Sequence, residues 1–330
     1  MRFGAYLTGA FGQSDALYRA RNELGKRGSS ADAFEAQLLS DTKKVIELQQ
    51  AAGLSYVIDP MFRWFSIFYP LIKGVRNARE GPQNPWAKNL FYNWPIIDGP
   101  LSHDDAGFIE KFLYLDLLPK GKAAAVLPSP YTVLMASDVK GYRDQRSALL
   151  DLAQLFREES KRLVEKGVVR ILYEEPVIAL KQSRGSIQRD DFTLLRVAME
   201  YCGHIEGATT SLQISLGTIG DQGDKETLIP FLRDLPVDCV GIDGTRTSID
   251  EIARHRFDGK ELAIGLLDAR SASMEDPGNL ATKLRRVMEE ARPSRLFLTP
   301  DTSTEYIGWT LATQKLDIMK RTLQELAENE

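Results

Sequence analysis

Acidic side chains stand at the ends of several short apolar runs in this sequence. They are Asp59, Glu174, Glu175, Asp243, Asp268 and Asp301. If the runs are parallel strands of one closed sheet, their ends meet on the same face, and we expect one acidic mouth there. Carboxylates in a mouth can bind an amine or a hard cation such as magnesium. They can equally form strand-end salt bridges or cap neighbouring helices, and both interpretations stand.

The elements that must position these carboxylates alternate along the whole chain. Eight apolar, β-rich runs are each followed by a helical or mixed segment, which is the pattern of parallel βα units. The sequence therefore predicts a (β/α)8 TIM barrel. The expected strands are Phe3–Thr8, Ser55–Ile58, Ala123–Leu127, Val168–Tyr173, Thr210–Leu216, Asp238–Ile242, Leu262–Leu267 and Arg295–Leu298.

One connection is much longer than a helical crossover. Residues 60–122 separate the second and third runs and carry Trp64, Trp86 and Trp94. We expect a long, elaborated second βα loop that lies over the rim. Its aromatic side chains can cover a flat ligand or a partner surface, or simply pack in a core. With no internal repeat or linker, residues 1–330 are predicted to form a single domain.

Composition narrows the classes of function. The net charge is −4, and charges of both signs are spread along the chain, so no basic patch indicates nucleic acid or an anionic membrane surface. No apolar run is long enough to cross a bilayer, and the first residues do not resemble a signal peptide. Only two cysteines are present. We expect a cytoplasmic protein that binds a small molecule or a protein partner.

Several short motifs at the predicted strand and helix ends follow one another along the chain. They are Thr8-Gly9-Ala10-Phe11-Gly12-Gln13, Gln49 through Ala52-Gly53-Leu54, Leu127-Pro128-Ser129-Pro130-Tyr131-Thr132, Tyr173-Glu174-Glu175-Pro176, Ala263 through Ser271, Leu298-Thr299-Pro300-Asp301 and Lys315-Leu316. In order and approximate spacing they resemble motifs of the cobalamin-independent methionine synthase family, most strongly in the C-terminal third. The resemblance implies methyl transfer to homocysteine in methionine biosynthesis. If the chain is an enzyme, S-methyl transfer is the expected reaction.

The sequence differs from the family pattern at the residues of the family's metal site. In that family a zinc ion binds the homocysteine thiol and lowers its pKa. At the positions that match the zinc ligands, this chain has Gln213, Ser215, Asp243 and Thr302. Only Asp243 is a good zinc ligand, since amide and hydroxyl oxygens are poor substitutes for thiolate and imidazole. We therefore expect zinc affinity to collapse, and we expect no metal and no cofactor.

Other matched positions have also changed. Ala10 and Met61 align with family residues that hold the amino acid, whereas Glu174 stands in for the aspartate that contacts the substrate amine. The segment Phe62–Pro70 is similar to single-barrel archaeal paralogues and to the zinc-less N-terminal barrel of long synthases. The candidate substrate-binding residues at the rim are Glu174, Glu175, Asp59, Asp243, Asp301 and Ser129.

Three hypotheses for function follow from the resemblance to the family and from the positions at which this chain differs from it. The first is a barrel that binds an amino acid or methyl carrier and takes part in methionine-related methyl transfer. The second is a non-catalytic subunit that docks on a zinc-bearing methionine synthase homologue. The third is a zinc-free enzyme with different chemistry.

Overall fold

The computed structural model describes residues 2–24, 31–87, 90–103, 107–221 and 226–328. Eight parallel strands form one curled sheet in the order β1-β11-β10-β9-β8-β7-β5-β2. The Ser55 amide donates to the Ala5 carbonyl at 2.8 Å, which links the two ends of this order. The prediction of a (β/α)8 barrel is confirmed. The strands are β1 (Phe3–Ala5), β2 (Val57–Ile58), β5 (Ala123–Pro128), β7 (Arg170–Glu175), β8 (Thr209–Ile214), β9 (Cys239–Asp243), β10 (Glu261–Leu267) and β11 (Leu296–Pro300).

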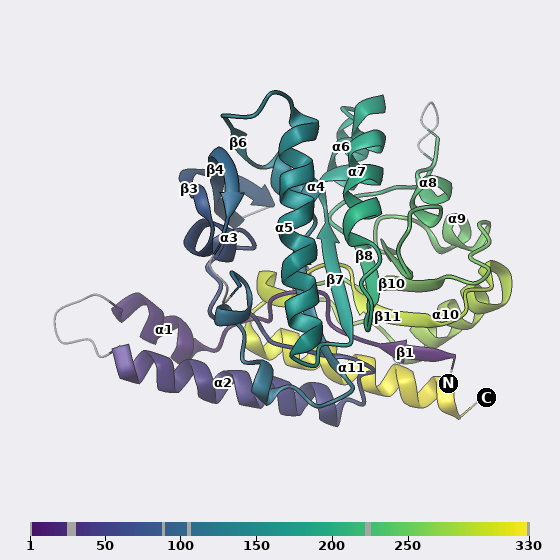
Figure 1. Cartoon of the computed structure of the whole chain (residues 1–330). Helices are drawn as coiled ribbons and strands as arrows, with labels where there is room; N and C mark the ends of the chain where they lie inside the picture. The colour runs from purple at the N-terminus through teal and green to yellow at the C-terminus, as the bar shows by residue number, and fades with distance from the viewer. Residues whose placement is uncertain (1, 25–30, 88–89, 104–106, 222–225, 329–330) are drawn as a thin grey trace.

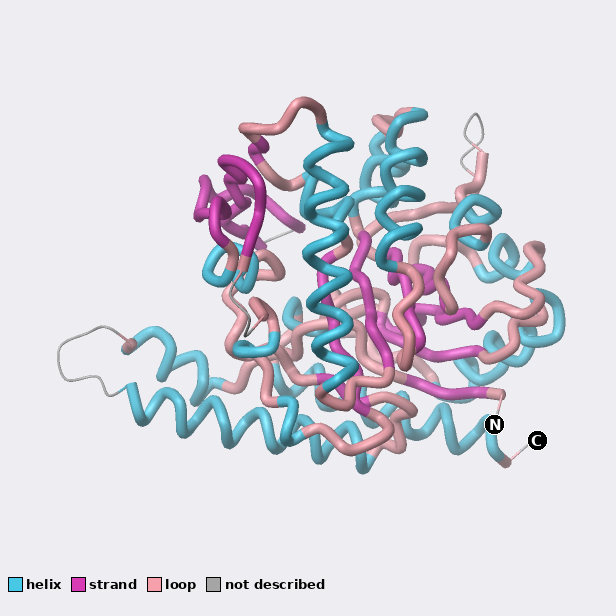
Figure 2. Tube along the Cα trace, viewed as in Figure 1, coloured by secondary structure: helices cyan, strands magenta, loops and turns pink. Residues whose placement is uncertain are grey.

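Helices surround the strands on the outside (Figure 2). Each main helix buries its apolar stripe against the sheet; in α10, for example, Leu280, Leu284 and Val287 recur at helical spacing and are buried. The helices are α1 (Asp15–Glu23), α2 (Ala31–Ala51), α4 (Pro130–Met135), α5 (Gln145–Glu165), α6 (Val177–Arg184), α7 (Arg189–Cys202), α8 (Ile229–Arg233), α9 (Ile249–Ala253), α10 (Pro277–Ala291) and α11 (Trp309–Ala327). None of the helices in the described ranges is long and apolar enough to cross a membrane.

The second βα loop is elaborated, as predicted. It contains α3 (Tyr69–Gly74) and an antiparallel hairpin of β3 (Arg76–Ala87) and β4 (Leu90–Ser102). Strand β4 also pairs with the short β6 (Asp138–Val139), so the hairpin belongs to a separate three-stranded sheet. In Figure 1 this hairpin lies toward the end of the barrel to which the arrow of β7 points.

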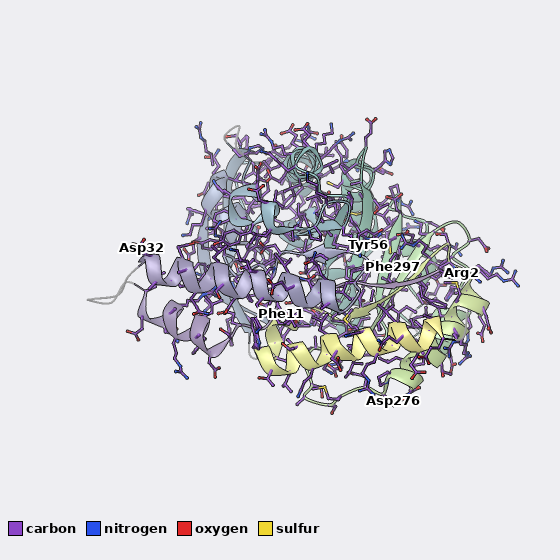
Figure 3. All side chains as sticks on the ribbon, turned by 90° about the horizontal axis from the view of Figure 1, so that it is seen from below. Arg2, Phe11, Asp32, Tyr56, Asp276 and Phe297 are labelled. Carbon is purple, nitrogen blue, oxygen red and sulfur yellow. The ribbon has the colours of Figure 1, made fainter. Side chains whose placement is uncertain are left out.

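The opposite end of the barrel is closed by a buried cation. The Arg170 side chain, at the first residue of β7, is fully buried and forms an ion pair with Glu261 at 2.7 Å. Its guanidinium lies 4.6 Å from the ring centroid of Tyr56 and 4.9 Å from that of Phe297, and these two rings are neighbours in Figure 3. Helices α2 and α11 lie side by side on the outside of the barrel, next to β2 and β1 respectively (Figure 3). The closed floor leaves the carboxyl-terminal face as the place for a site.

Candidate functional site

A small cavity of about 20 Å³ lies at the carboxyl-terminal ends of the strands. A cavity of this size holds about one water molecule. Its wall combines residues of the barrel rim with residues of the second βα loop, so the loop covers the rim as predicted. The lining residues are Ala10, Met61, Trp64, Ser66, Ile67, Trp86, Tyr92, Glu174, Pro176, Ser215, Leu216, Thr302, Ser303, Glu305 and Tyr306.

Glu174 is the candidate residue that faces this cavity. It is partly buried near the end of β7. Among the described residues, no hydrogen bond or ion pair engages its carboxylate. Burial, followed by the nearby carboxylate of Glu305, raises the pKa of Glu174 to about 8. Gly9 makes room for this side chain, because a Cβ at Gly9 would lie 2.6 Å from Glu174 Oε1.

Glu305 is a second carboxylate of the cavity, and the sequence reasoning missed it. It lies in the short helix η3 (Thr304–Tyr306). The Tyr92 hydroxyl of the hairpin donates to Glu305 Oε1 at 2.7 Å, and the Ser303 hydroxyl donates to the same oxygen at 3.1 Å. Burial raises the pKa of Glu305, while the bond from Tyr92 acts in the opposite direction. The signal that could have found it is its position shortly after the Leu298–Asp301 motif.

Glu175 and Ser129, two other candidates, are engaged with each other. The Ser129 hydroxyl donates to Glu175, the Thr132 hydroxyl donates to Glu175 Oε2 at 2.8 Å, and the Ile178 amide donates to Oε1 at 3.0 Å. Glu175 is fully buried, and this burial raises its pKa to about 7. The pair thus fixes the starts of α4 and α6 and lies outside the cavity lining, in contrast to its expected role in substrate contact.

Asp59 also differs from the expectation of a shared acidic mouth. Its Oδ1 accepts from the Met61 amide at 2.7 Å, and its Oδ2 accepts from the Tyr114 amide at 2.8 Å. Burial raises the pKa of this carboxyl to about 6. Asp59 therefore holds the two ends of the second βα loop to the barrel rather than lining the cavity.

Asp243 and Asp301 come together, as expected, but around a cation of the chain itself. The Arg270 guanidinium donates to Asp301 Oδ2 and lies 3.6 Å from Asp243 Oδ2. Both carboxylates are almost completely buried, and the Thr245 hydroxyl bridges them at 2.7 and 3.2 Å. Burial and the neighbouring Asp301 raise the pKa of Asp243 to about 7. The chain thus places a guanidinium against Asp243, the one good metal ligand among the four residues that the sequence comparison matched to zinc ligands.

The other three residues matched to zinc ligands by sequence divide between the cavity and the barrel interior. Ser215 and Thr302 line the cavity. Gln213 pairs with Glu174 in the parallel ladder, is 1% exposed, and its amide oxygen and nitrogen have no hydrogen-bond partner among the described residues. Its side chain lies against Gly241, where an added Cβ would meet Gln213 Oε1 at 1.9 Å. The four residues therefore present hydroxyls, an amide and a neutralised carboxylate.

These features define a parallel α/β barrel with a small cavity at the carboxyl-terminal face, which is the face where barrel enzymes hold their sites. The chain belongs to the cobalamin-independent methionine synthase family, because the family profile described as "Cobalamin-independent synthase, Catalytic domain" matches residues 5–325. The sequence-based recognition of this family is confirmed.

Individual relatives are distant. A 5-methyltetrahydropteroyltriglutamate–homocysteine methyltransferase from Thermotoga maritima is 22% identical over 326 residues, covering 97% of this chain and 44% of the relative. The chain thus spans less than half the length of that protein. A methionine synthase from Saccharolobus islandicus is 23% identical, covering 89% of this chain and 86% of the relative.

Solved structures agree on the fold. A B12-independent methionine synthase from Shewanella, solved with selenomethionine, superposes with a TM-score of 0.72 at 17% identity and covers 98% of this chain and 97% of that one. A putative vitamin-B12-independent methionine synthase from Listeria monocytogenes superposes with a TM-score of 0.75 at 15% identity. The superposition covers 100% of this chain and 99% of that one.

Proposed function

We propose that the protein is a zinc-independent member of its family that binds a small substrate or product of methyl transfer through the amine of that ligand. The observation that carries the proposal is Glu174, a carboxylate that faces the cavity and lacks a partner within the described ranges. Leaving a partly buried carboxylate unpaired is costly, and an ammonium group supplies both the charge and the hydrogen bonds that it lacks.

The donor set supports zinc independence. Zinc needs ligands that can converge with open lone pairs, and three of the four matched positions offer only neutral oxygen or nitrogen. Asp243 Oδ1 already accepts from the Thr245 amide and hydroxyl and from the Arg246 amide. Its Oδ2 faces Arg270, so a metal ion would have to displace a guanidinium of like charge. The residues present do not fit a zinc ion.

The test uses purified protein with homocysteine and methionine as probes. We expect both to raise the melting temperature, because a ligand at 100 times its Kd stabilises the folded state by about 2.7 kcal/mol. The variant Glu174→Gln keeps the side-chain volume and should weaken binding by about tenfold to hundredfold, the loss of one charge-assisted hydrogen bond. Unchanged affinity in this variant would show that Glu174 is structural.

A second candidate function is a non-catalytic subunit that docks on a zinc-bearing homologue. The changed residues at the zinc positions favour it, because a partner would then supply the metal. A stable co-purified complex, together with no turnover by the isolated chain, is the expected result for this candidate. Robust homocysteine methylation by the isolated chain would refute it.

A further inference from the structure

Helix α7 lines a groove on the outside of the barrel. The groove has a volume of about 750 Å³, and Figure 1 shows α7 in the outer layer beside α5. Phe192 of α7 and Phe231 of the short α8 both line it and contact each other edge to face, with ring centroids 4.9 Å apart. The residues that line the rim cavity do not come from α7, so the groove is a separate feature.

The residues of α7 that line this groove form one stripe. They recur at intervals of three and four residues, which places them on a single face of the helix. The opposite face of α7, with Leu195, Ala198 and Met199, is buried in the barrel. The stripe therefore points away from the core. It consists of Arg189, Phe192, Thr193, Arg196, Val197 and Glu200.

The stripe is complementary to its own reverse. Its spacing is the same when it is followed from Arg189 to Glu200 or from Glu200 to Arg189. In an antiparallel pair of these helices, Arg189 of one copy faces Glu200 of the other copy at both ends. Phe192 faces Val197 in the middle, and the two remaining positions pair a hydroxyl with a guanidinium. The stripe thus has the charge pattern of a surface that binds a second copy of itself.

The two end charges have no partner within the chain. Among the described residues, no hydrogen bond or ion pair engages Arg189 or Glu200. They stand eleven residues apart in α7, about 16 Å along its axis, so they cannot pair with each other. A second copy supplies both missing partners at once. A uniformly acidic or basic peptide would meet one end of the stripe with a like charge.

We propose that α7 forms a two-fold interface in which the stripes of two copies of this chain pack antiparallel. Such an interface uses the same patch on both subunits. A crossing angle of about 20° keeps the helix ends close enough for the long side chains of Arg189 and Glu200 to meet. A single stripe is smaller than a standard protein interface, so we expect a dissociation constant on the order of tens of micromolar.

Sedimentation velocity of the full chain tests the interface over about 1–500 µM, where monomer should give way to dimer. Arg189→Glu and Glu200→Arg each place like charges at both ends, and each should raise the dissociation constant at least about tenfold. The double variant with both changes restores opposite charges and should return the constant to within about threefold of its original value. Glu47→Arg, at an exposed position of α2, makes the same charge change as Glu200→Arg and should have no effect.

Three results would overturn the inference. They are a monomer at about 500 µM, a dimer that neither single reversal weakens, and a weakening that the double variant does not repair. The first result would leave the groove to another protein or to a small ligand. At about 1 µM the chain is a monomer, so all these variants should melt almost as the original chain does, which checks their folding.

Cross-linking gives a second readout that does not depend on charge. A variant with both Arg189→Cys and Glu200→Cys should be linked into a covalent dimer by a short bis-maleimide. Each single variant should stay unlinked, because equal positions of the two copies lie about 16 Å apart. Cys202 and Cys239 are buried and should not react. No covalent dimer from the double cysteine variant, or equal linking of a single variant, would contradict the antiparallel arrangement.

Discussion

Replacing Glu174 with glutamine should stabilise the ligand-free protein at alkaline pH. The pKa of this carboxyl rises from 4.5 to about 8 on folding because burial and Glu305 disfavour its charged form. The folded state therefore holds the proton more tightly than the unfolded state, and stability falls as the pH rises from about 4.5 to about 8. At about 1.36 kcal/mol per pKa unit, the full difference corresponds to about 5 kcal/mol. Since the Glu174 side chain is only partly buried, we expect about 2–5 kcal/mol.

This magnitude translates into a measurable shift in melting temperature. With an unfolding entropy of about 2.1 cal/mol/K per residue, the chain should gain about 3–7 °C at pH 9 in Glu174→Gln and almost nothing at pH 4. Scanning fluorimetry across this pH range measures the difference. Glu200→Gln, an exposed position of α7, is the matched control and should leave the melting temperature almost unchanged at both pH values. A loss of stability in Glu174→Gln at pH 9 would refute the reasoning and favour a strand-end salt bridge.

Three further expectations concern the metal positions and the hairpin. Purified protein should carry little zinc by elemental analysis, and one zinc per unaltered chain would contradict this expectation. A triple variant with Gln213→His, Ser215→Cys and Thr302→Cys should gain zinc binding. Arg270→Met leaves Asp243 and Asp301 without their cation and should cost about 3–5 kcal/mol in urea unfolding at pH 8. The loss should shrink at pH 5, where Asp243, with a pKa of about 7, is protonated; an equal loss at both pH values would argue against the ion pair. Tyr92→Phe removes the bond to Glu305, worth about 1.5–3 kcal/mol, and should speed ligand association in stopped-flow tryptophan fluorescence; an unchanged rate would show that this bond does not limit entry.

The barrel could be predicted from sequence because its strands are local patterns. Short apolar runs such as Val168–Tyr173 and Leu262–Leu267 stand between amphipathic segments, and each gave a strand within a few residues. The hairpin β3–β4 could not be predicted. Its first strand contains Gly81, Pro82 and Pro85, which disfavour a regular strand, and pairing with β4 decides its structure.

The site was harder to predict because its contacts join distant segments. The sequence placed Glu174 correctly at a strand end. Nothing in the local sequence shows that Glu174 faces the cavity while Glu175 does not, because the partners of Glu175, Ser129 and Thr132, lie more than 40 residues away. Arg270 stood in a quoted motif, but its position between Asp243 and Asp301 depends on three neighbouring strand ends. Which side chains form hydrogen bonds or ion pairs with one another is decided by the folded barrel and cannot be read from their spacing in the sequence.

The size of the cavity makes ligand binding depend on the hairpin. A space of about 20 Å³ admits little more than a water molecule, so an amine can enter only if a wall moves. The wall that carries Glu174 belongs to the parallel ladder of the barrel, which is held by hydrogen bonds on both sides. The wall that carries Tyr92 belongs to the hairpin and reaches the rim through Glu305. A cation that binds Glu305 competes with Tyr92 for this carboxylate, so binding of the ligand and release of the hairpin are coupled through one residue.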